Sequence, residues 1–140
     1  MPSSFCHVAV HIVFATKNHS TWIKKDLQAQ VHAYIAGIIS NIGGKPIRVG
    51  GIEDHVHILC LIPKDQSLGE FLAKIKANSS KWFRQTHCSD FSWQDGYAAF
   101  SVSKSNMQAV ENYISNQETH HHDTTAEDEF TELLKKHQNQ

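Results

Sequence analysis

Apolar and polar residues follow two kinds of pattern along this chain. Short apolar runs rich in Val, Ile and Phe indicate strands, and longer stretches with apolar residues every three or four positions indicate amphipathic helices. The strands are predicted over residues 5–15, 46–52, 55–62 and 97–103. The helices are predicted from Ser20 or Thr21 to about Ile42, from Ser67 to about Thr86, from about Asn106 to Gln117, and over residues 126–137.

The predicted order is β-α-β-β-α-β followed by a helical tail. This is the split βαβ arrangement of ferredoxin-like α+β folds, in which an antiparallel sheet has its first and third strands as central neighbours. The turn at residues 53–54 is short, as an antiparallel hairpin requires. The glycines at 43–44 should end the first helix, and Ser67 and Ser105 should cap the starts of the next two.

Composition suits one domain spanning residues 1–140, because the chain is 40% hydrophobic and long enough to bury a core. The three cysteines are widely spaced and form no CxxC pair, which is typical of a reducing cytosol. No apolar stretch is long enough to cross a membrane, and the N-terminus lacks the pattern of a signal peptide. We therefore expect a cytoplasmic protein with no membrane partner.

Charge is unevenly distributed, although the net charge is only −1. Residues 1–110 carry 11 Lys and Arg against 7 Asp and Glu, whereas residues 111–140 carry 2 against 7. The first part is therefore basic and the tail acidic. An ordinary solvated surface can show the same imbalance, so charge alone does not identify a nucleic-acid binder.

His55 and His57 lie inside the apolar run 55–62. Residues i and i+2 of a strand project from one face, with Cα atoms roughly 7 Å apart, so the two imidazoles could hold one metal ion. Val56 points to the opposite face, into a core. The pair alone is weak evidence, because the chain has 11 histidines and two strand histidines bonded to neighbouring groups would give the same pattern.

Tyr113 and Gln117 lie one turn apart on the predicted helix after the fourth strand, so they share a face of it. That helix can lie across the open face of the sheet, over His55 and His57. Two imidazoles and one amide oxygen would then leave room for water and a phosphate oxygen in an octahedral Mg²⁺ or Mn²⁺ site. Tyr113 beside the metal is a candidate nucleophile. Taken singly, each residue is better interpreted without a function, Tyr113 as a tyrosine half buried against the sheet and Gln117 as a solvent-exposed glutamine.

Four segments together resemble the small HUH tyrosine transposases of the insertion sequence 200/605 family. They are HIVFATK at 11–17, HVH at 55–57, GYAAFSVS at 96–103 and YISNQETHH at 113–121. These segments occur in the family's order and extend over nearly the whole chain. The loop at 18–20 has less basic and aromatic character than relatives often carry there.

The resemblance implies a DNA transposase of the prokaryotic cytosol or nucleoid. His55, His57 and Gln117 would ligate the divalent metal, Mg²⁺ or Mn²⁺. Tyr113 would attack single-stranded DNA, leaving a 5′-phosphotyrosine and a free 3′-hydroxyl that can reverse the reaction. Family members act as homodimers on DNA hairpins at element ends, and in some the tyrosine helix of one subunit serves the histidines of the other.

The basic candidates for DNA binding lie on the second predicted helix and at strand ends: Lys74, Lys81, Arg84, Lys17 and Lys104. The run at 120–122 is all histidine, and we interpret it as polar residues at a helix end rather than as ligands. Other functions remain open from the sequence. They are a domesticated relative that nicks palindromes, a non-catalytic single-stranded DNA-binding protein, and a small metal hydrolase in which Tyr113 is dispensable.

Overall fold

A 4-stranded antiparallel sheet with the spatial order β2-β3-β1-β4 forms the centre of the protein. The strands are β1 (Ala9–Ala15), β2 (Lys45–Ile52), β3 (His55–Leu61) and β4 (Ala98–Ser101). The computed structural model describes residues 4–117 and 126–138. β1 and β3 are the central neighbours, so the predicted ferredoxin-like arrangement of strands is confirmed.

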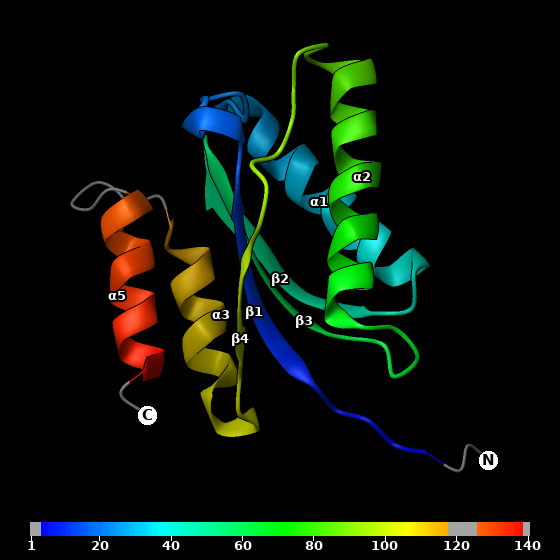
Figure 1. The fold of residues 1–140 in the computed structure, drawn as a ribbon, viewed down its shortest axis with the longest axis vertical. Helices are drawn as coiled ribbons and strands as arrows, with labels where there is room; N and C mark the ends of the chain where they lie inside the picture. Colours follow the sequence, from blue (N-terminus) through cyan, green and yellow to red (C-terminus); the bar gives the residue numbers. More distant parts are fainter. Residues whose placement is uncertain (1–3, 118–125, 139–140) are drawn as a thin grey trace.

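Helices lie on both faces of this sheet (Figure 1). α1 (Lys25–Asn41) and α2 (Leu68–Thr86) cover one face, and α3 (Met107–Ser115) and α5 (Ala126–Gln138) lie on the other side. Two short 3-10 helices, η1 (Lys17–His19) and η2 (Lys104–Asn106), follow β1 and precede α3. Within the described part of the chain, no helix is both long and apolar enough to span a bilayer.

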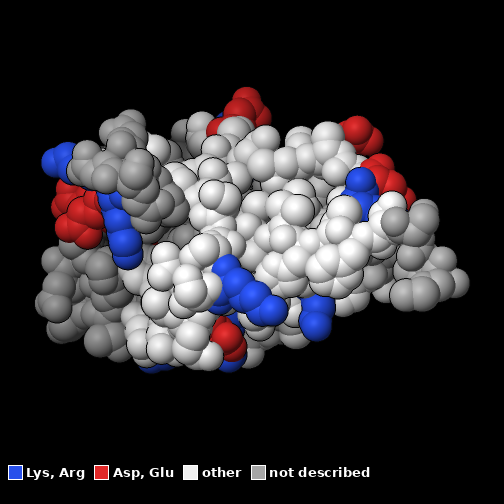
Figure 2. All heavy atoms as spheres, turned by 90° about the horizontal axis from the view of Figure 1, so that it is seen from below, with Lys and Arg blue, Asp and Glu red and all other residues white. Residues whose placement is uncertain are grey.

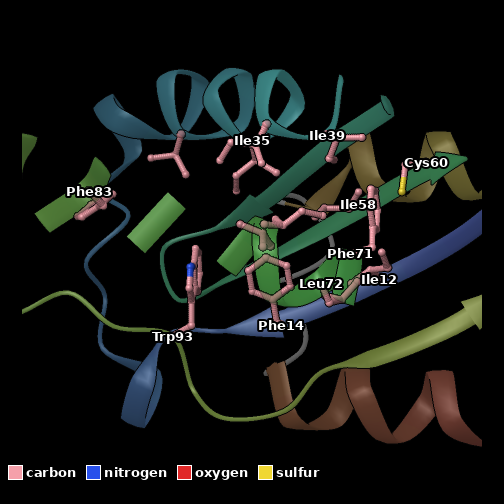
Figure 3. Close-up of a cluster of buried hydrophobic side chains, with 14 of the residues drawn as sticks. Ile12, Phe14, Ile35, Ile39, Ile58, Cys60, Phe71, Leu72, Phe83 and Trp93 are labelled. Carbon is pink, nitrogen blue, oxygen red and sulfur yellow. The ribbon is translucent and has the colours of Figure 1, made fainter. Parts of the chain in front are cut away.

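The hydrophobic core fills the space between the sheet and the helices α1 and α2 (Figure 3). Alternate residues of the central strands, among them Ile12, Phe14 and Ile58, meet Ile35 of α1 and Phe71 of α2 there. Fully burying a side chain of this kind contributes roughly 1.5–3 kcal/mol. This layer therefore holds the sheet to its helices without any ligand.

Two helix ends match the sequence prediction. Ser67 accepts a hydrogen bond from the backbone N–H of Glu70 at 3.1 Å, which caps α2 as expected. Gly43 has φ 98°, and Gly44 N–H donates to the Ile39 carbonyl at 2.9 Å. This is a Schellman ending of α1, which needs a residue tolerant of the left-handed region at position 43.

The predicted starts of three elements are wrong, and a distant partner or a short 3-10 helix accounts for each. β1 begins at Ala9 instead of residue 5 because β3 ends at its partner Leu61, and Phe5 is 91% exposed. α1 begins at Lys25 with no side-chain cap, because Ile23 N–H is bonded to the carbonyl of Glu53 in the β2–β3 turn. The expected cap of α3 at Ser105 is absent, because residues 104–106 form η2.

Candidate metal and tyrosine site

The histidines of β3 project from the face of the sheet that lies opposite the core. His55 and His57 are both buried there, 3% and 0% exposed. His11 of β1 joins them, with its Nε2 2.8 Å from Nδ1 of His57 and the two rings stacked at 5.1 Å. A hydrogen bond to one ring nitrogen fixes the orientation of a histidine and directs its other nitrogen. His11 therefore orients His57.

His55 is held in the same way by a carboxylate. Its Nδ1 lies 2.8 Å from Oδ1 of Asp54, the residue before it in the β2–β3 turn. Its Nε2 lies 3.3 Å from Oε1 of Gln117 and 3.8 Å from Oε2 of Glu129. A carboxylate behind an imidazole is the usual support of a metal-binding histidine. The sequence analysis treated Asp54 only as a turn residue, although its place directly before the pair was a signal.

Gly50 allows α3 to approach the sheet closely. A Cβ at this position would lie 2.7 Å from both the carbonyl oxygen and a side-chain carbon of Ile114. Because Gly50 pairs with His57 across the β2–β3 ladder, α3 is brought over the histidines. Arg48 of β2 adds an ion pair of 2.9 Å to Glu111 on α3.

Tyr113 and Gln117 meet the histidines within one chain. The Tyr113 ring lies 5.7 Å from the His57 ring, and Gln117 is 1% exposed with its Oε1 beside His55. Gln117 Nε2 also donates to the Tyr113 carbonyl at 3.5 Å. The structure thus brings together the four residues proposed from the sequence as nucleophile and ligands.

Glu129 of α5 is a fifth member that the sequence analysis missed. It is 2% exposed, its Oε1 lies 2.8 Å from Nε2 of His57, and Tyr113 donates its hydroxyl proton to the same carboxylate. Ligand atoms of His55, His57 and Glu129 all lie within 4.8 Å of one another. Nothing in the sequence separates Glu129 from the other acidic residues of the tail, so only the packing of α5 identifies it.

Burial and charge together set the protonation of these groups. Burial alone would lower the pKa of His55, but the hydrogen bonds and charges of Asp54 and Glu129 outweigh it and raise the pKa to about 9. Burial and the adjacent carboxylate raise the pKa of Tyr113 well above its usual range. Burial would also raise the pKa of Glu129, yet bonds from His55, His57 and Tyr113 hold it well below its usual range.

Two cavities flank this cluster. One, of about 480 Å³, is lined by His57 and Tyr97 among others, and the second, of about 450 Å³, is lined by Tyr113. Glu129 and Leu133 line both, so α5 forms part of the wall between them.

The predicted DNA-binding residues fall into two groups. Lys74, Lys81 and Arg84 are exposed on α2, on the opposite side of the sheet from the histidines, and the structure does not bring them to the site. Lys17 and Lys104 are exposed in η1 and η2, beside residues that line the first and second cavities respectively. Figure 2 shows one face of the molecule, on which Lys and Arg stand apart instead of forming a continuous patch.

The histidines at 120–122 lie outside the described residues, so their interpretation as helix-end residues stays a prediction.

A family profile described as "Transposase IS200 like" matches residues 4–117, most of the chain. The protein belongs to the IS200-like transposase family. The family assignment places this transposase among proteins of DNA transposition and recombination, and it confirms the resemblance seen in the sequence. No curated protein sequence matches the chain.

Two solved structures resemble this IS200-like transposase in fold. A protein of Deinococcus radiodurans R1 assigned as a transposase is 18% identical, with TM-score 0.64 over 84% of this chain and 95% of its own. A REP-associated tyrosine transposase bound to a REP hairpin is 10% identical, with TM-score 0.63 over 86% of this chain and 73% of its own. At these identities the likeness concerns the fold.

The donors present suit a divalent metal. Imidazole nitrogens, a carboxylate and an amide oxygen are all ligands of Mn²⁺ and related ions, and here they converge in a buried cluster. Hydrogen bonds behind His55 and His57 orient both rings toward this point. The buried His55, His57 and Glu129 could therefore hold a metal ion.

Proposed function

We propose that this transposase cleaves and rejoins single-stranded DNA, with Tyr113 as nucleophile and with His55, His57 and Gln117 as ligands of Mg²⁺ or Mn²⁺. One observation carries the proposal. The Tyr113 hydroxyl donates to the Glu129 carboxylate that also contacts His57, and Tyr113 lines one of the two cavities beside this cluster.

The reaction exchanges one phosphodiester for another. The Tyr113 oxygen forms a bond to phosphorus while the bond from phosphorus to the 3′-oxygen breaks, which leaves a 5′-phosphotyrosine and a 3′-hydroxyl. The tyrosine loses a proton and the departing oxygen gains one, so the number of phosphodiester bonds is unchanged. A bound divalent cation supplies charge stabilisation at the phosphate and favours the deprotonated phenol. Reversal by a 3′-hydroxyl of another DNA end completes strand transfer.

DNA hairpins at element ends are the proposed substrate, and a homodimer is the proposed assembly. The hairpin bound by a REP-associated relative of the same fold supports the first part. Lys17, Lys74, Lys81, Arg84 and Lys104 are the proposed phosphate contacts. The whole chain, residues 1–140, would act as one domain.

An exposed apolar segment supports the dimer. Phe5 and Val8, before β1, are 91% and 45% exposed, and a second subunit would cover them. Light scattering at micromolar concentration should give twice the monomer mass, and a monomer would reject this part. Because the described cluster forms within one chain, sharing of sites between subunits remains a separate prediction.

The test of the nucleophile is a covalent adduct. Wild-type protein incubated with labelled single-stranded hairpin DNA and Mn²⁺ should give a band that resists denaturation. Tyr113→Phe should abolish the band while DNA binding and folding persist. Tyr97→Phe, at the exposed tyrosine lining the first cavity, is the matched control and should keep it. An adduct of normal yield with Tyr113→Phe would exclude Tyr113 as nucleophile.

The same experiment separates the alternative functions. A metal hydrolase would cleave DNA without any adduct, and a non-catalytic binding protein would neither cleave nor form one. A domesticated nicking relative would form the adduct, and only the DNA flanking its gene would distinguish it from a mobile transposase.

A further inference from the structure

We infer that Glu129 of α5 is a fourth protein ligand of the metal, and that the C-terminal helix thereby becomes part of the metal site. The inference rests on the proposed function and goes beyond the ligand set of His55, His57 and Gln117. The Glu129 carboxylate is buried at the centre of the cluster, where it contacts both a candidate ligand and the proposed nucleophile.

The spacing of the donor atoms supports coordination of one ion. Ligand distances of about 2.1 Å in an octahedral site place adjacent donors about 3 Å apart. Here Nε2 of His57 lies 2.8 Å from Oε1 of Glu129, and Nε2 of His55 lies 3.3 Å from Oε1 of Gln117 and 3.8 Å from Oε2 of Glu129. Four donors from β3, α5 and the end of the tyrosine helix are therefore already near adjacent positions of one coordination sphere.

Charge gives a second reason. Two imidazoles and an amide carry no negative charge in the form that binds metal, whereas Mg²⁺ and Mn²⁺ prefer carboxylate oxygens. Asp54 lies behind His55 and bonds its Nδ1, so it is not directed at the same point. Among the described residues, Glu129 is the acidic group placed to neutralise an ion held between His55 and His57.

The same carboxylate also positions Tyr113. The tyrosine hydroxyl donates to Glu129, so an ion bound to this carboxylate would lie close to the tyrosine oxygen. The Glu129 carboxylate thus connects α5, which carries it, to α3, which carries the proposed nucleophile Tyr113. Metal binding should accordingly stabilise the docking of α5.

Calorimetric titration with Mn²⁺ tests this directly, using the full chain without DNA. Glu129→Gln keeps the shape and removes the charge, and it should lower Mn²⁺ affinity by about tenfold or more, because loss of even a group that only supports a ligand costs about 10- to 100-fold. Glu129→Ala should lower it at least as far. Glu132→Gln is the matched control, because it removes the same charge from an exposed position of α5 and should leave affinity unchanged. Thermal unfolding without metal verifies that each variant is folded.

A parallel titration of a His55→Ala, His57→Ala protein distinguishes the proposed metal site as a whole from the additional role of Glu129 in it. Loss of Mn²⁺ binding in that protein, with normal affinity in Glu129→Gln, would overturn the role of Glu129 and leave the proposed site standing. Unchanged affinity in the double variant would reject the site itself. Wild-type protein offers a test without any substitution, since Mn²⁺ should slow amide hydrogen exchange in α5, and no slowing there would also overturn the inference.

Discussion

The two faces of the sheet differ in the side chains that they bury, since one buries apolar side chains and the other buries histidines. On β3, Val56 and Ile58 face the core with α1 and α2, while His55 and His57 face α3 and α5. The apolar face gains free energy simply by excluding water. The histidine face must pair every buried polar group, because an unpaired one is costly. Because side chains alternate along β3, one of its faces contributes to the apolar core and the other presents the histidines of the candidate site.

This difference explains why the second face needs more of the chain. The core is covered by α1 and α2, which connect strands of the sheet. The histidines are satisfied only when His11, Asp54, Gln117 and Glu129 converge on them from four other segments. The side chains of this cluster now bond one another, and the same nitrogen and oxygen atoms could bond a ligand instead.

The largest effect on stability should come from the apolar face. Ile58→Ala leaves a cavity in the core and should lower the free energy of unfolding by about 2–5 kcal/mol. Because His57 projects from the other face, the folded fraction should still bind Mn²⁺ with wild-type affinity. Urea unfolding followed by calorimetry below the transition checks both points. Loss of Mn²⁺ binding in folded protein would show that the two faces are not separable.

A smaller effect is expected where α3 meets the sheet. Gly50→Ala places a methyl group against the Ile114 carbonyl, and overpacking of this kind costs about 1–3 kcal/mol. The displaced helix carries Tyr113, so adduct formation should fall more than stability suggests. Gly37→Ala, in α1 with no atom within 4 Å of the new Cβ, should instead stabilise by up to about 1 kcal/mol. Full adduct yield with Gly50→Ala would show that the position of α3 is not critical.

The two faces should also respond oppositely to pH. Burial lowers the pKa of His32 on α1 to about 4, and its buried Nε2 has no hydrogen-bond partner among the described residues. The unfolded chain therefore takes up a proton below about 6.5, and His32 alone should lower the free energy of unfolding by about 1–2 kcal/mol between pH 7 and pH 5. In metal-free protein, the stabilisation from His55 is present below about 6.5 and is lost as pH rises through about 9.

Urea denaturation at pH 5 and at pH 7 measures how much the free energy of unfolding changes on acidification. The change in the free energy of unfolding from pH 7 to pH 5 should be less destabilising in His32→Gln than in wild-type protein by about 1–2 kcal/mol. An equal loss of stability on acidification in both proteins would place the responsible group elsewhere.

The smallest expected effect is on DNA binding, and it shows which side of the sheet contacts the DNA. Each phosphate contact to single-stranded DNA contributes about 0.7 to the slope of log affinity against log salt. Replacing Lys17 and Lys104, or Lys74, Lys81 and Arg84, by Gln should reduce this slope, and fluorescence anisotropy over a range of salt measures it. A set whose removal leaves the slope unchanged does not contact the phosphates.

Local patterns were sufficient to predict the fold and the likeness to the family. Runs of Val and Ile marked the strands, and Ser67 and the glycines at 43–44 marked helix ends, because these signals depend on neighbours in sequence. The starts of β1 and α1 were missed because partners distant in the chain determine them, Leu61 for the strand and Glu53 for the helix. Glu129 was not identified as part of the cluster for the same reason.

The position of Glu129 has a consequence for how metal binding can vary. The family profile ends at residue 117, whereas Glu129 lies on α5 beyond it. If the tail contributes a ligand, the proposed histidine and glutamine ligands and the proposed nucleophile lie within the part of the chain that the family profile matches, whereas the charged ligand lies outside it. Substitutions in α5 alone could then make metal binding tighter or weaker without any change in the matched segment.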